Sequence, residues 1–294
     1  MSLRAGVVGW GDAGKIHARY LIEHGAHLAG IVSRSKPGEA IPWFRSLEEL
    51  LPAVDAVSIT TPNFLHAESV LKSVRAGKAV LVEKPLCIRR DELEQLQMVL
   101  RSVDVPVHVG FRLRFNDTIR KMRRPGLSPS RVHCSYQLGI ERLAAGKSWT
   151  RDSSLSGGAF FVLGVHCLDL VRWICGADGR PIRNLIGMRD SHPEFPLQVS
   201  LMGQLGETQI GISVDLRGSS AYHLRLSVDW ADQEKPRVVS LSGERPGVRE
   251  EAEFSGLIGN FVRAAKQGNP DPRGVAELLQ IHRELLAARD QIEL

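Results

Sequence analysis

The first 110 residues alternate between short apolar runs and segments with helical periodicity, and this alternation restricts the fold more than any other feature. Such nearly continuous apolar runs are typical of parallel strands covered on both faces; they are residues 5–8, 28–32, 56–59, 79–82 and 107–109. Between them, segment 67–74 places apolar residues at i, i+3, i+4 and i+7. Strands that alternate with helices predict right-handed βαβ units and an open α/β sheet.

The pattern changes in the second half of the chain, and we place the domain boundary between residues 118 and 119. Strand-like runs follow at 131–138, 182–188, 197–204, 208–215 and 223–229, and helical patterns at 158–174, 254–267 and 274–289. In run 223–229 apolar Leu224, Leu226 and Val228 alternate with polar residues, as in an antiparallel strand with one exposed face. Residues 119–294 therefore predict an α+β domain with a largely antiparallel open sheet.

A glycine motif directly follows the first apolar run and opens the first helical pattern. It reads Gly9-Trp10-Gly11-Asp12-Ala13-Gly14, a GxGxxG. In this strand–turn–helix context Gly9 permits a tight turn, Gly11 the approach of a pyrophosphate, and Gly14 close helix–strand packing. The motif predicts a Rossmann domain that binds a nicotinamide dinucleotide, with the phosphates at the helix N-terminus. The alternative is a glycine-rich turn that binds no ligand.

The residues after the second apolar run indicate which dinucleotide binds. An NAD-specific site places a carboxylate on the ribose hydroxyls about 20 residues beyond the motif. Here the run ends in Ser33, Arg34, Ser35 and Lys36, whose hydroxyls and cations suit a 2′-phosphate. This segment favours NADP(H) over NAD(H), unless it is only a basic surface turn.

Composition argues against several other classes of protein. The chain has 294 residues and a formal net charge of +5, too modest to indicate nucleic-acid binding. No apolar stretch approaches the roughly 20 residues of a membrane span, and the N-terminus lacks a secretion-signal pattern, so we expect a cytoplasmic protein without a membrane partner. The cysteines form no CxxC pair, which favours buried reduced thiols over a metal site; they are Cys87, Cys134, Cys167 and Cys175.

Several short motifs occur in order along the chain. They are the glycine motif with Lys15-Ile16-His17-Ala18, Thr61-Pro62-Asn63 with His66, Gly77-Lys78, Glu83-Lys84-Pro85, Gly110-Phe111-Arg112, Arg114-Phe115-Asn116, and Gly157-Gly158 with Gly164, His166 and Asp169. In their order and spacing these motifs resemble the Gfo/Idh/MocA family of glucose–fructose oxidoreductases and inositol dehydrogenases. The resemblance implies hydride transfer between a nicotinamide and a carbonyl, hydroxyl or imine of a small sugar-like substrate.

The resemblance also implies roles for single residues. It assigns cofactor contacts to Thr61, Pro62, Asn63, His66, Glu83 and Arg112. It assigns substrate contacts to Arg114, Trp149, Arg151 and His166, and it puts Lys84 at the reacting carbon–oxygen bond. A lysine suits that position because its ammonium can polarise a carbonyl and donate a proton.

One departure from the family pattern affects the expected chemistry. The family carries an aspartate four residues before the helical histidine, and here that position is Val162. Valine neither accepts a proton nor hydrogen-bonds a hydroxyl, so we expect His166 to act with Lys84. Tyr136 and Tyr222 are further proton donors that the sequence does not place. The alternative is a sensor or regulator that binds a dinucleotide without turnover.

The sequence also suggests a substrate charge and an assembly. Arg112, Arg114 and Arg151 suggest a substrate carrying negative charge. An open sheet would expose apolar side chains, and burying them against a second copy would give a homodimer or homotetramer. The resemblance agrees, since relatives associate through this sheet.

Overall fold

The computed structural model describes residues 2–38, 40–177, 179–190, 196–218, 221–243 and 250–293, and it divides into two compact units. The first unit contains Met1–Arg112 and Glu251–Val275, and the second contains Leu113–Glu250 and Ala276–Leu294. The first unit thus ends near the expected boundary at 118. In contrast to the expected continuous second domain, it also recruits a segment from near the C-terminus.

The first unit is built on a six-stranded parallel sheet in the order β3-β2-β1-β4-β5-β6. Its strands are β1 (Leu3–Val8), β2 (Ala26–Val32), β3 (Trp43–Phe44), β4 (Ala56–Ile59), β5 (Ala79–Val82) and β6 (Val107–Val109). Every residue of β4 and β5 is buried, as the continuous apolar runs predict. The strand order reverses direction at β1, where the chain passes to β4, so the open α/β prediction is confirmed.

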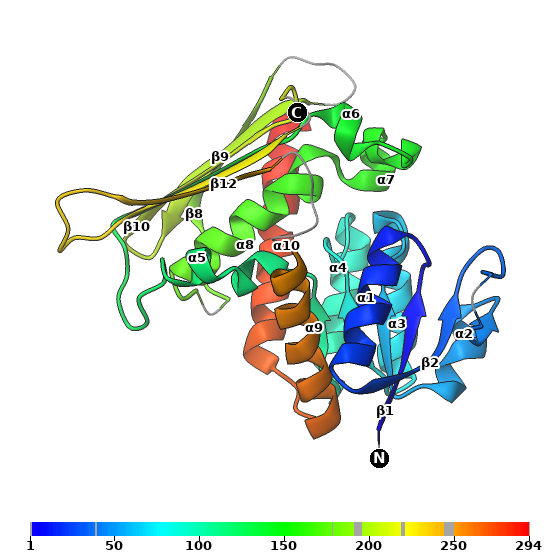
Figure 1. Ribbon diagram of the computed structural model, residues 1–294. Helices are drawn as coiled ribbons and strands as arrows, with labels where there is room; N and C mark the ends of the chain where they lie inside the picture. Colours follow the sequence, from blue (N-terminus) through cyan, green and yellow to red (C-terminus); the bar gives the residue numbers. More distant parts are fainter. Residues whose placement is uncertain are drawn as a thin grey trace. The chain divides into compact units, whose positions relative to one another are not determined.

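The helices of this unit carry amphipathic patterns that bury one face on the sheet. They are α1 (Asp12–Glu23), α2 (Leu47–Leu50), α3 (His66–Arg75), α4 (Arg90–Leu100) and α9 (Glu250–Gln267). Figure 1 shows α9, in orange, beside α1, in blue. The two helices are joined by contacts from His24, whose ring nitrogen Nε2 lies 3.1 Å from the Ser255 hydroxyl. Helix α9, from near the C-terminus, therefore packs within the N-terminal unit.

The second unit is built on a sheet in the order β12-β11-β7-β10-β9-β8. Its strands are β7 (Arg131–Gln137), β8 (Arg183–Arg189), β9 (Gln198–Leu205), β10 (Thr208–Asp215), β11 (Tyr222–Asp229) and β12 (Arg237–Gly243). Among these described strands only β10 and β7 pair in parallel, so the largely antiparallel sheet is confirmed. The prediction omitted β12, in which only Val238, Val239 and Leu241 are apolar, and the two-residue β3.

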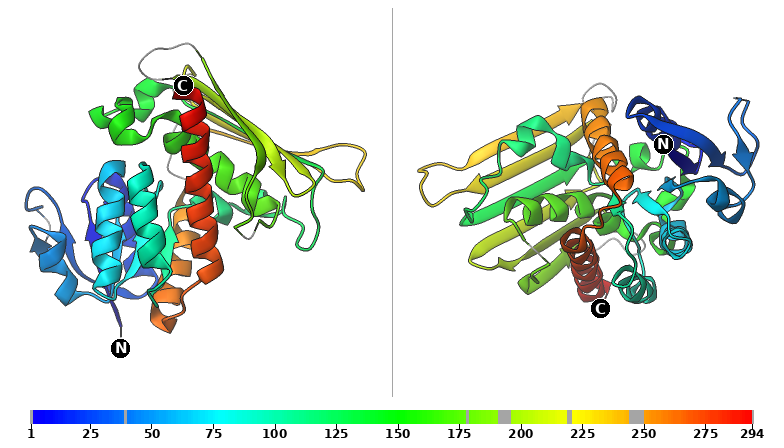
Figure 2. Two further views of the ribbon diagram at one scale, coloured as in Figure 1. Left: turned by 180° about the vertical axis from the view of Figure 1, so that it is seen from behind. Right: turned by 90° about the horizontal axis from the view of Figure 1, so that it is seen from below.

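Helices cover one face of this sheet. They are α5 (Asp117–Arg120), α6 (Ile140–Leu143), α7 (Ser153–Ser156), α8 (Val165–Ile174) and α10 (Pro272–Glu293), and a π-helical turn (Phe160–Gly164) leads into α8. Figure 2 shows α8 lying along the sheet. Segment Ser153–Ile174 is long and apolar enough to cross a bilayer, although the sequence analysis found no such stretch. Of the apolar window of this segment, 89% is buried within the protein, and this burial identifies the segment as the core of the unit.

A buried ionic cluster fixes α8 against α10. The Arg172 guanidinium is fully buried, with Nε 2.5 Å from Glu277 Oε1 and Nη1 2.7 Å from Glu284 Oε1. Burial raises the pKa of the Glu284 carboxyl, and the charge of Arg172 opposes that shift. Because a buried charge without its partner is strongly unfavourable, these pairs hold α8, which carries His166, in one position.

Candidate functional site

The GxGxxG turn has the geometry that the sequence predicts. Gly9 has φ +101°, and Thr60 at the end of β4 donates from its hydroxyl to the Gly9 carbonyl at 2.9 Å. A Cβ on Gly14 would lie 2.0 Å from the Gly9 carbonyl oxygen, so the start of α1 packs directly on the turn. A Cβ on Gly11 would meet nothing within 4 Å, which leaves open space where the backbone amides face outward.

Two buried donors beside this turn have no hydrogen-bond partner among the residues that the structure describes. They are the indole Nε1 of Trp10 and the hydroxyl of Thr61. A buried donor without an acceptor costs about 1–3 kcal/mol, so such groups usually serve a ligand. Phosphate and ribose oxygens are acceptors of the required kind. The open backbone at Gly11 and these two donors therefore fit a dinucleotide.

The segment after β2 is basic and exposed. Arg34 and Lys36 are exposed, and the Ser33 hydroxyl donates to the Ser35 carbonyl at 2.6 Å, which forms a tight turn. Trp43 of β3 donates from Nε1 to the Ser33 carbonyl at 3.2 Å and so anchors the end of β2. Glu39, the first carboxylate after β2, lies outside the described residues.

His66 ties two loops of the first unit together. Its ring is 1% exposed, with Nδ1 2.6 Å from the Pro85 carbonyl oxygen and Nε2 2.7 Å from the Thr61 carbonyl oxygen. Burial lowers the pKa of His66, while both carbonyls and the charge of Glu83 act in the other direction. Both ring nitrogens face backbone carbonyls, and the neutral ring can donate to one of them, so His66 contacts the loops that carry Thr61 and Lys84. Asn63, in the same loop as Thr61, is also buried.

Glu83 and Lys84 follow β5, with Lys84 half-buried. Glu83 Oε1 lies 3.2 Å from Nε2 of the buried His17, and its other carboxylate oxygen accepts from the Lys84 backbone N–H at 3.3 Å. Burial opposes ionisation of Glu83. The hydrogen bond and charge of His17, with the charges of Lys84 and Arg112, outweigh it and lower the pKa of Glu83 to about 2. The site therefore holds a permanent negative charge beside Lys84.

Helix α9 contributes residues that the sequence analysis missed. The Arg112 guanidinium forms an ion pair with Glu253, and it lies over the Phe254 ring at 5.4 Å from the centroid. Phe254 also packs edge-on against His17, with ring centroids 5.7 Å apart. No local pattern assigns residues 251–275 to the Rossmann unit, so only a comparison with relatives could have found these partners.

In the second unit, His166 lies on α8 beside an aromatic cluster of the sheet. Its ring centroid is 6.0 Å from that of Tyr136, and Tyr136 is 6.4 Å from Tyr222. His166 and Tyr136 are both nearly buried. Val162, one turn before His166, is 5% exposed in the apolar π-helical turn. The structure thus gives Tyr136, which the sequence could not place, a position next to His166.

Asp169, one turn after His166, pairs with Arg114. The Arg114 Nε lies 2.9 and 3.1 Å from the two carboxylate oxygens of Asp169, which is 1% exposed. Burial raises the pKa of Asp169 to about 6, although the charge of Arg114 acts in the other direction. Asp169 therefore holds Arg114 in place.

This raised pKa gives a testable dependence of stability on pH. The folded state holds the Asp169 proton more tightly than the unfolded chain, whose ordinary value is 3.8. The stabilisation of the folded state by the Asp169 proton is therefore complete below pH 3.8, and it decreases by on the order of 3 kcal/mol as the pH rises towards 6. We expect Asp169→Asn, which does not titrate, to flatten the free energy of unfolding between about pH 4 and 6. Urea unfolding at a series of pH values in this range measures the free energy of unfolding, and Asp232→Asn, at an exposed position, is the control. An unchanged slope in Asp169→Asn would contradict the assignment.

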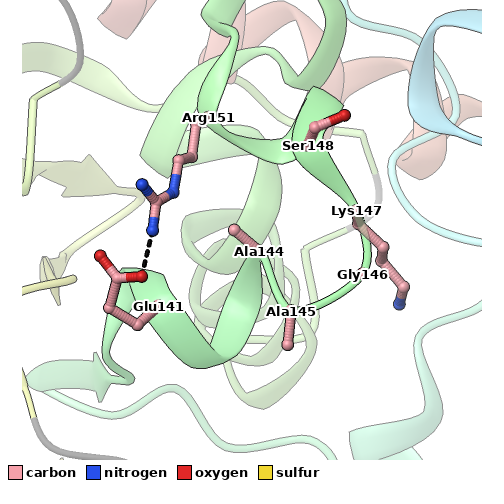
Figure 3. A pocket seen from close by; sticks show the side chains of 7 residues that line it. All are labelled: Glu141, Ala144, Ala145, Gly146, Lys147, Ser148 and Arg151. Atoms are coloured by element: carbon pink, nitrogen blue, oxygen red, sulfur yellow. Dashed lines mark hydrogen bonds and ion pairs between the residues drawn. The ribbon is translucent and has the colours of Figure 1, made fainter.

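Arg151 lines a hollow of the second unit, shown in Figure 3, and Trp149 belongs to the same short helix, Ser148–Arg151. The hollow has a volume of about 500 Å³, and Arg151 is joined across it to Glu141. Lys147 is a further cation on its rim.

The three arginines that suggested an anionic substrate have carboxylate partners in the structure. Arg112, Arg114 and Arg151 each pair with a carboxylate: Glu253, Asp169 and Glu141, respectively. The sequence showed three cations, but their charges are balanced within the protein. All four cysteines are buried and none forms a disulfide, in line with the expected reduced thiols. The part of the chain that the structure describes contains no cluster of three His, Cys, Asp or Glu side chains suited to a metal ion.

The predicted residues thus gather in two groups, one in each unit. In the first unit the Gly9–Gly14 turn, Thr61, His66, Glu83 and Lys84 follow β1, β4 and β5 at the carboxyl end of the parallel sheet, where α/β proteins bind ligands. In the second unit His166 and Arg114 both contact residues of the β7–α8 layer. His17 and Ser58 join the first group and had no assigned role.

Comparison with known proteins gives the same two parts. Residues 3–111 match the model of an oxidoreductase family with an NAD-binding Rossmann fold, and residues 128–245 match the GFO/IDH/MocA C-terminal domain. A scyllo-inositol 2-dehydrogenase (NAD(+)) of Bacillus subtilis is 28% identical over 60% of this chain and 55% of its own length. A UDP-N-acetylglucosamine 3-dehydrogenase of Acidithiobacillus ferrooxidans is 29% identical over 62% of this chain and 57% of its own. Each match thus spans little more than half of that relative.

Solved structures extend the likeness in fold to the whole chain. The myo-inositol 2-dehydrogenase of Lactobacillus plantarum superposes with a TM-score of 0.84 at 18% identity, over 100% of this chain and 98% of its own. The scyllo-inositol dehydrogenase of Lactobacillus casei, solved with NAD(H) and scyllo-inositol, gives a TM-score of 0.83 at 19% identity, over 100% and 97%. With both halves matched by its domain models, this chain belongs to the Gfo/Idh/MocA oxidoreductase family.

Proposed function

We propose that the protein is a nicotinamide-dinucleotide-dependent oxidoreductase that interconverts a hydroxyl and a carbonyl group of a neutral polyol or sugar. The observation that carries this proposal is the open Gly9–Gly14 turn, flanked by the unpartnered buried donors of Trp10 and Thr61. Relatives named for inositol support the substrate class. The largely buried ion pairs of Arg112 and Arg114 favour a substrate group without charge.

Lys84 is the proposed acid and base. The bound nicotinamide supplies or accepts the hydride. In oxidation, the substrate hydroxyl gives its proton to the neutral Lys84 amine while its carbon loses a hydride, and a carbonyl and an ammonium result; reduction reverses each transfer. The ionised Glu83, whose carboxylate accepts the Lys84 backbone N–H, stabilises the ammonium. His166 is the proposed second proton-transfer residue, in accordance with the family resemblance.

We further propose that NADP(H) binds more tightly than NAD(H). Arg34 and Lys36 are exposed after β2, and Ser33 stands where a carboxylate would repel a 2′-phosphate. The relative from Bacillus subtilis is named for NAD(+), so this preference would set the two proteins apart. A charge-assisted hydrogen bond contributes about 1.5–3 kcal/mol, which corresponds to at least about 10-fold in affinity.

Fluorescence titration with NADPH and NADH tests both proposals. We expect NADPH to bind about 10-fold more tightly, and Arg34→Ala to weaken NADPH while leaving NADH unchanged. Arg75→Ala, at the C-terminal end of α3, is a matched surface control. If neither dinucleotide binds, the oxidoreductase function is wrong; if NADH binds more tightly, only the preference is.

One observation favours a second candidate, a dinucleotide-dependent sensor without turnover. Val162 is buried in an apolar turn and offers no proton acceptor one turn before His166. The intact Glu83–Lys84 pair favours the enzyme. A sensor would bind the dinucleotide without oxidising or reducing any substrate in a broad panel.

We also propose assembly of two or more copies through the open face of the second sheet. One row across this face contains the exposed Ile186, Met202 and Val238, and at its centre lie Gly211 and His133. Apolar side chains thus lie near both edges of the sheet, as expected. The neighbouring row of side chains on the same face is mainly serine, with Ser135, Ser200 and Ser213 in register. Small side chains allow close approach of a second sheet. The molar mass from analytical ultracentrifugation tests this, and a monomer at micromolar concentration would refute it.

A further inference from the structure

We propose that His17 is the positioning residue of the active site, and that it fixes the Glu83 carboxylate and through it Lys84. This inference rests on the proposed function and deepens it. It concerns a residue of α1, three positions after Gly14, for which neither the glycine motif nor the chemistry of hydride transfer requires a histidine.

Three elements of the first unit fix the His17 ring. The ring is fully buried, with Nδ1 2.7 Å from the hydroxyl of Ser58 on β4 and Nε2 3.2 Å from Glu83 Oε1. Phe254 of α9 packs against it at an interplanar angle of 65°. Because both ring nitrogens have a polar neighbour, the ring has one orientation in which it can serve both. It therefore links β4, the end of β5 and α9.

Glu83 links the His17 ring to the backbone of Lys84. Its second oxygen accepts from the Lys84 backbone N–H. Gly110 closes the other side, because a Cβ there would lie 2.9 Å from Glu83 Oε1. The carboxylate is thus confined between His17, Gly110 and the Lys84 backbone, and a change in its orientation would move the lysine.

Charge gives the second part of the argument. The nearby Arg112 is already paired with Glu253, so His17 is the principal hydrogen-bonding side chain on the buried carboxylate. Without that hydrogen bond the pKa of Glu83 would rise, because burial disfavours the carboxylate. A carboxylate that is less ionised, or no longer held in place, would stabilise the Lys84 ammonium less, so the ammonium would give up a proton at lower pH.

Substitutions of similar size separate positioning from packing. In His17→Gln the side-chain amide nitrogen can reach the place of Nε2 and still donate to Glu83. In His17→Asn it reaches only the place of Nδ1, and His17→Phe keeps the ring without any donor. His24→Asn is the matched control, because His24 also lies at the end of α1 and contacts α9 through Ser255, away from Glu83.

The first readout is the reactivity of Lys84 in the protein without cofactor. Acetic anhydride labelling followed by mass spectrometry gives the pH midpoint of Lys84 acylation. We expect this midpoint to move to lower pH in His17→Asn and His17→Phe, and to stay unchanged in His17→Gln and His24→Asn. Unchanged midpoints in all four variants would overturn the proposal whatever the protein catalyses.

The second readout is turnover of scyllo-inositol with NADP+ or NAD+. We expect kcat to fall roughly 10- to 100-fold in His17→Asn and His17→Phe, with the affinity for NADPH within about threefold of wild type. His17→Gln should restore most of kcat. If kcat and NADPH affinity fell together in all His17 variants, His17 would serve packing only. Absence of turnover in wild type would refute the proposed substrate class and leave the labelling result to decide the role of His17.

Discussion

Lys84→Met is expected to lower kcat roughly 10³-fold while the affinity for NADPH stays within about threefold, because it removes proton transfer and leaves the dinucleotide contacts intact. Methionine is close to lysine in length and is uncharged, so the half-buried position is filled. Steady-state assays with scyllo-inositol and myo-inositol, with either dinucleotide, measure the effect.

Lys84→Arg separates proton transfer from charge at the same position. Arginine keeps the positive charge beside Glu83, but its guanidinium does not release a proton near neutral pH. We expect Lys84→Arg to be nearly as impaired as Lys84→Met. Recovery of kcat in Lys84→Arg would mean that only charge matters, and more than a tenth of wild-type activity in Lys84→Met would exclude Lys84 as the acid and base. A sensor would show no turnover in wild type.

Two glycines of the dinucleotide turn should respond differently to the same substitution. In Gly14→Ala the new methyl group would lie 2.0 Å from the Gly9 carbonyl oxygen. That oxygen belongs to the backbone, so the contact could be relieved only by moving the turn. We expect a loss of about 1–3 kcal/mol in the free energy of unfolding and a loss of measurable dinucleotide binding.

In Gly11→Ala the methyl group meets no atom within 4 Å, and Gly11 has φ −84°, which any residue adopts. The free energy of unfolding should stay within about 0.5 kcal/mol of wild type. Affinity for NADPH should nevertheless fall at least about 10-fold, because in the proposed site the pyrophosphate approaches the backbone most closely at Gly11. Thermal unfolding without ligand and calorimetric titration measure the two effects. Unchanged affinity in Gly11→Ala would show that the dinucleotide does not lie on this turn.

Much of the fold followed from local sequence patterns. The strand predicted at 208–215 coincides with β10, and the other predicted strands of the second sheet differ from the observed ones by a residue or so at their ends. Segment 237–243 was not predicted, because it has only three apolar residues, and one of them, Val238, is exposed. The short β3 has too few residues for any periodicity to be visible.

Among the site residues, motifs located the Gly9–Gly14 turn and the Glu83–Lys84 pair but not their surroundings. Arg112 meets Glu253, 141 residues away in sequence, and His17 meets Phe254 on the same helix. The sequence therefore showed Arg112, Arg114 and Arg151 as available cations, whereas each is paired in the folded chain.

The sequence by itself determined the alternation of strands and helices and the glycine turn, because backbone preference and hydrophobic periodicity depend on residues a few positions apart. Only the tertiary structure decided that α9 completes the first unit and which carboxylate neutralises which arginine. It also decided that His17 faces Glu83. Such pairings depend on which surfaces pack together, and the free energy of packing belongs to the whole unit and leaves no local pattern in the chain.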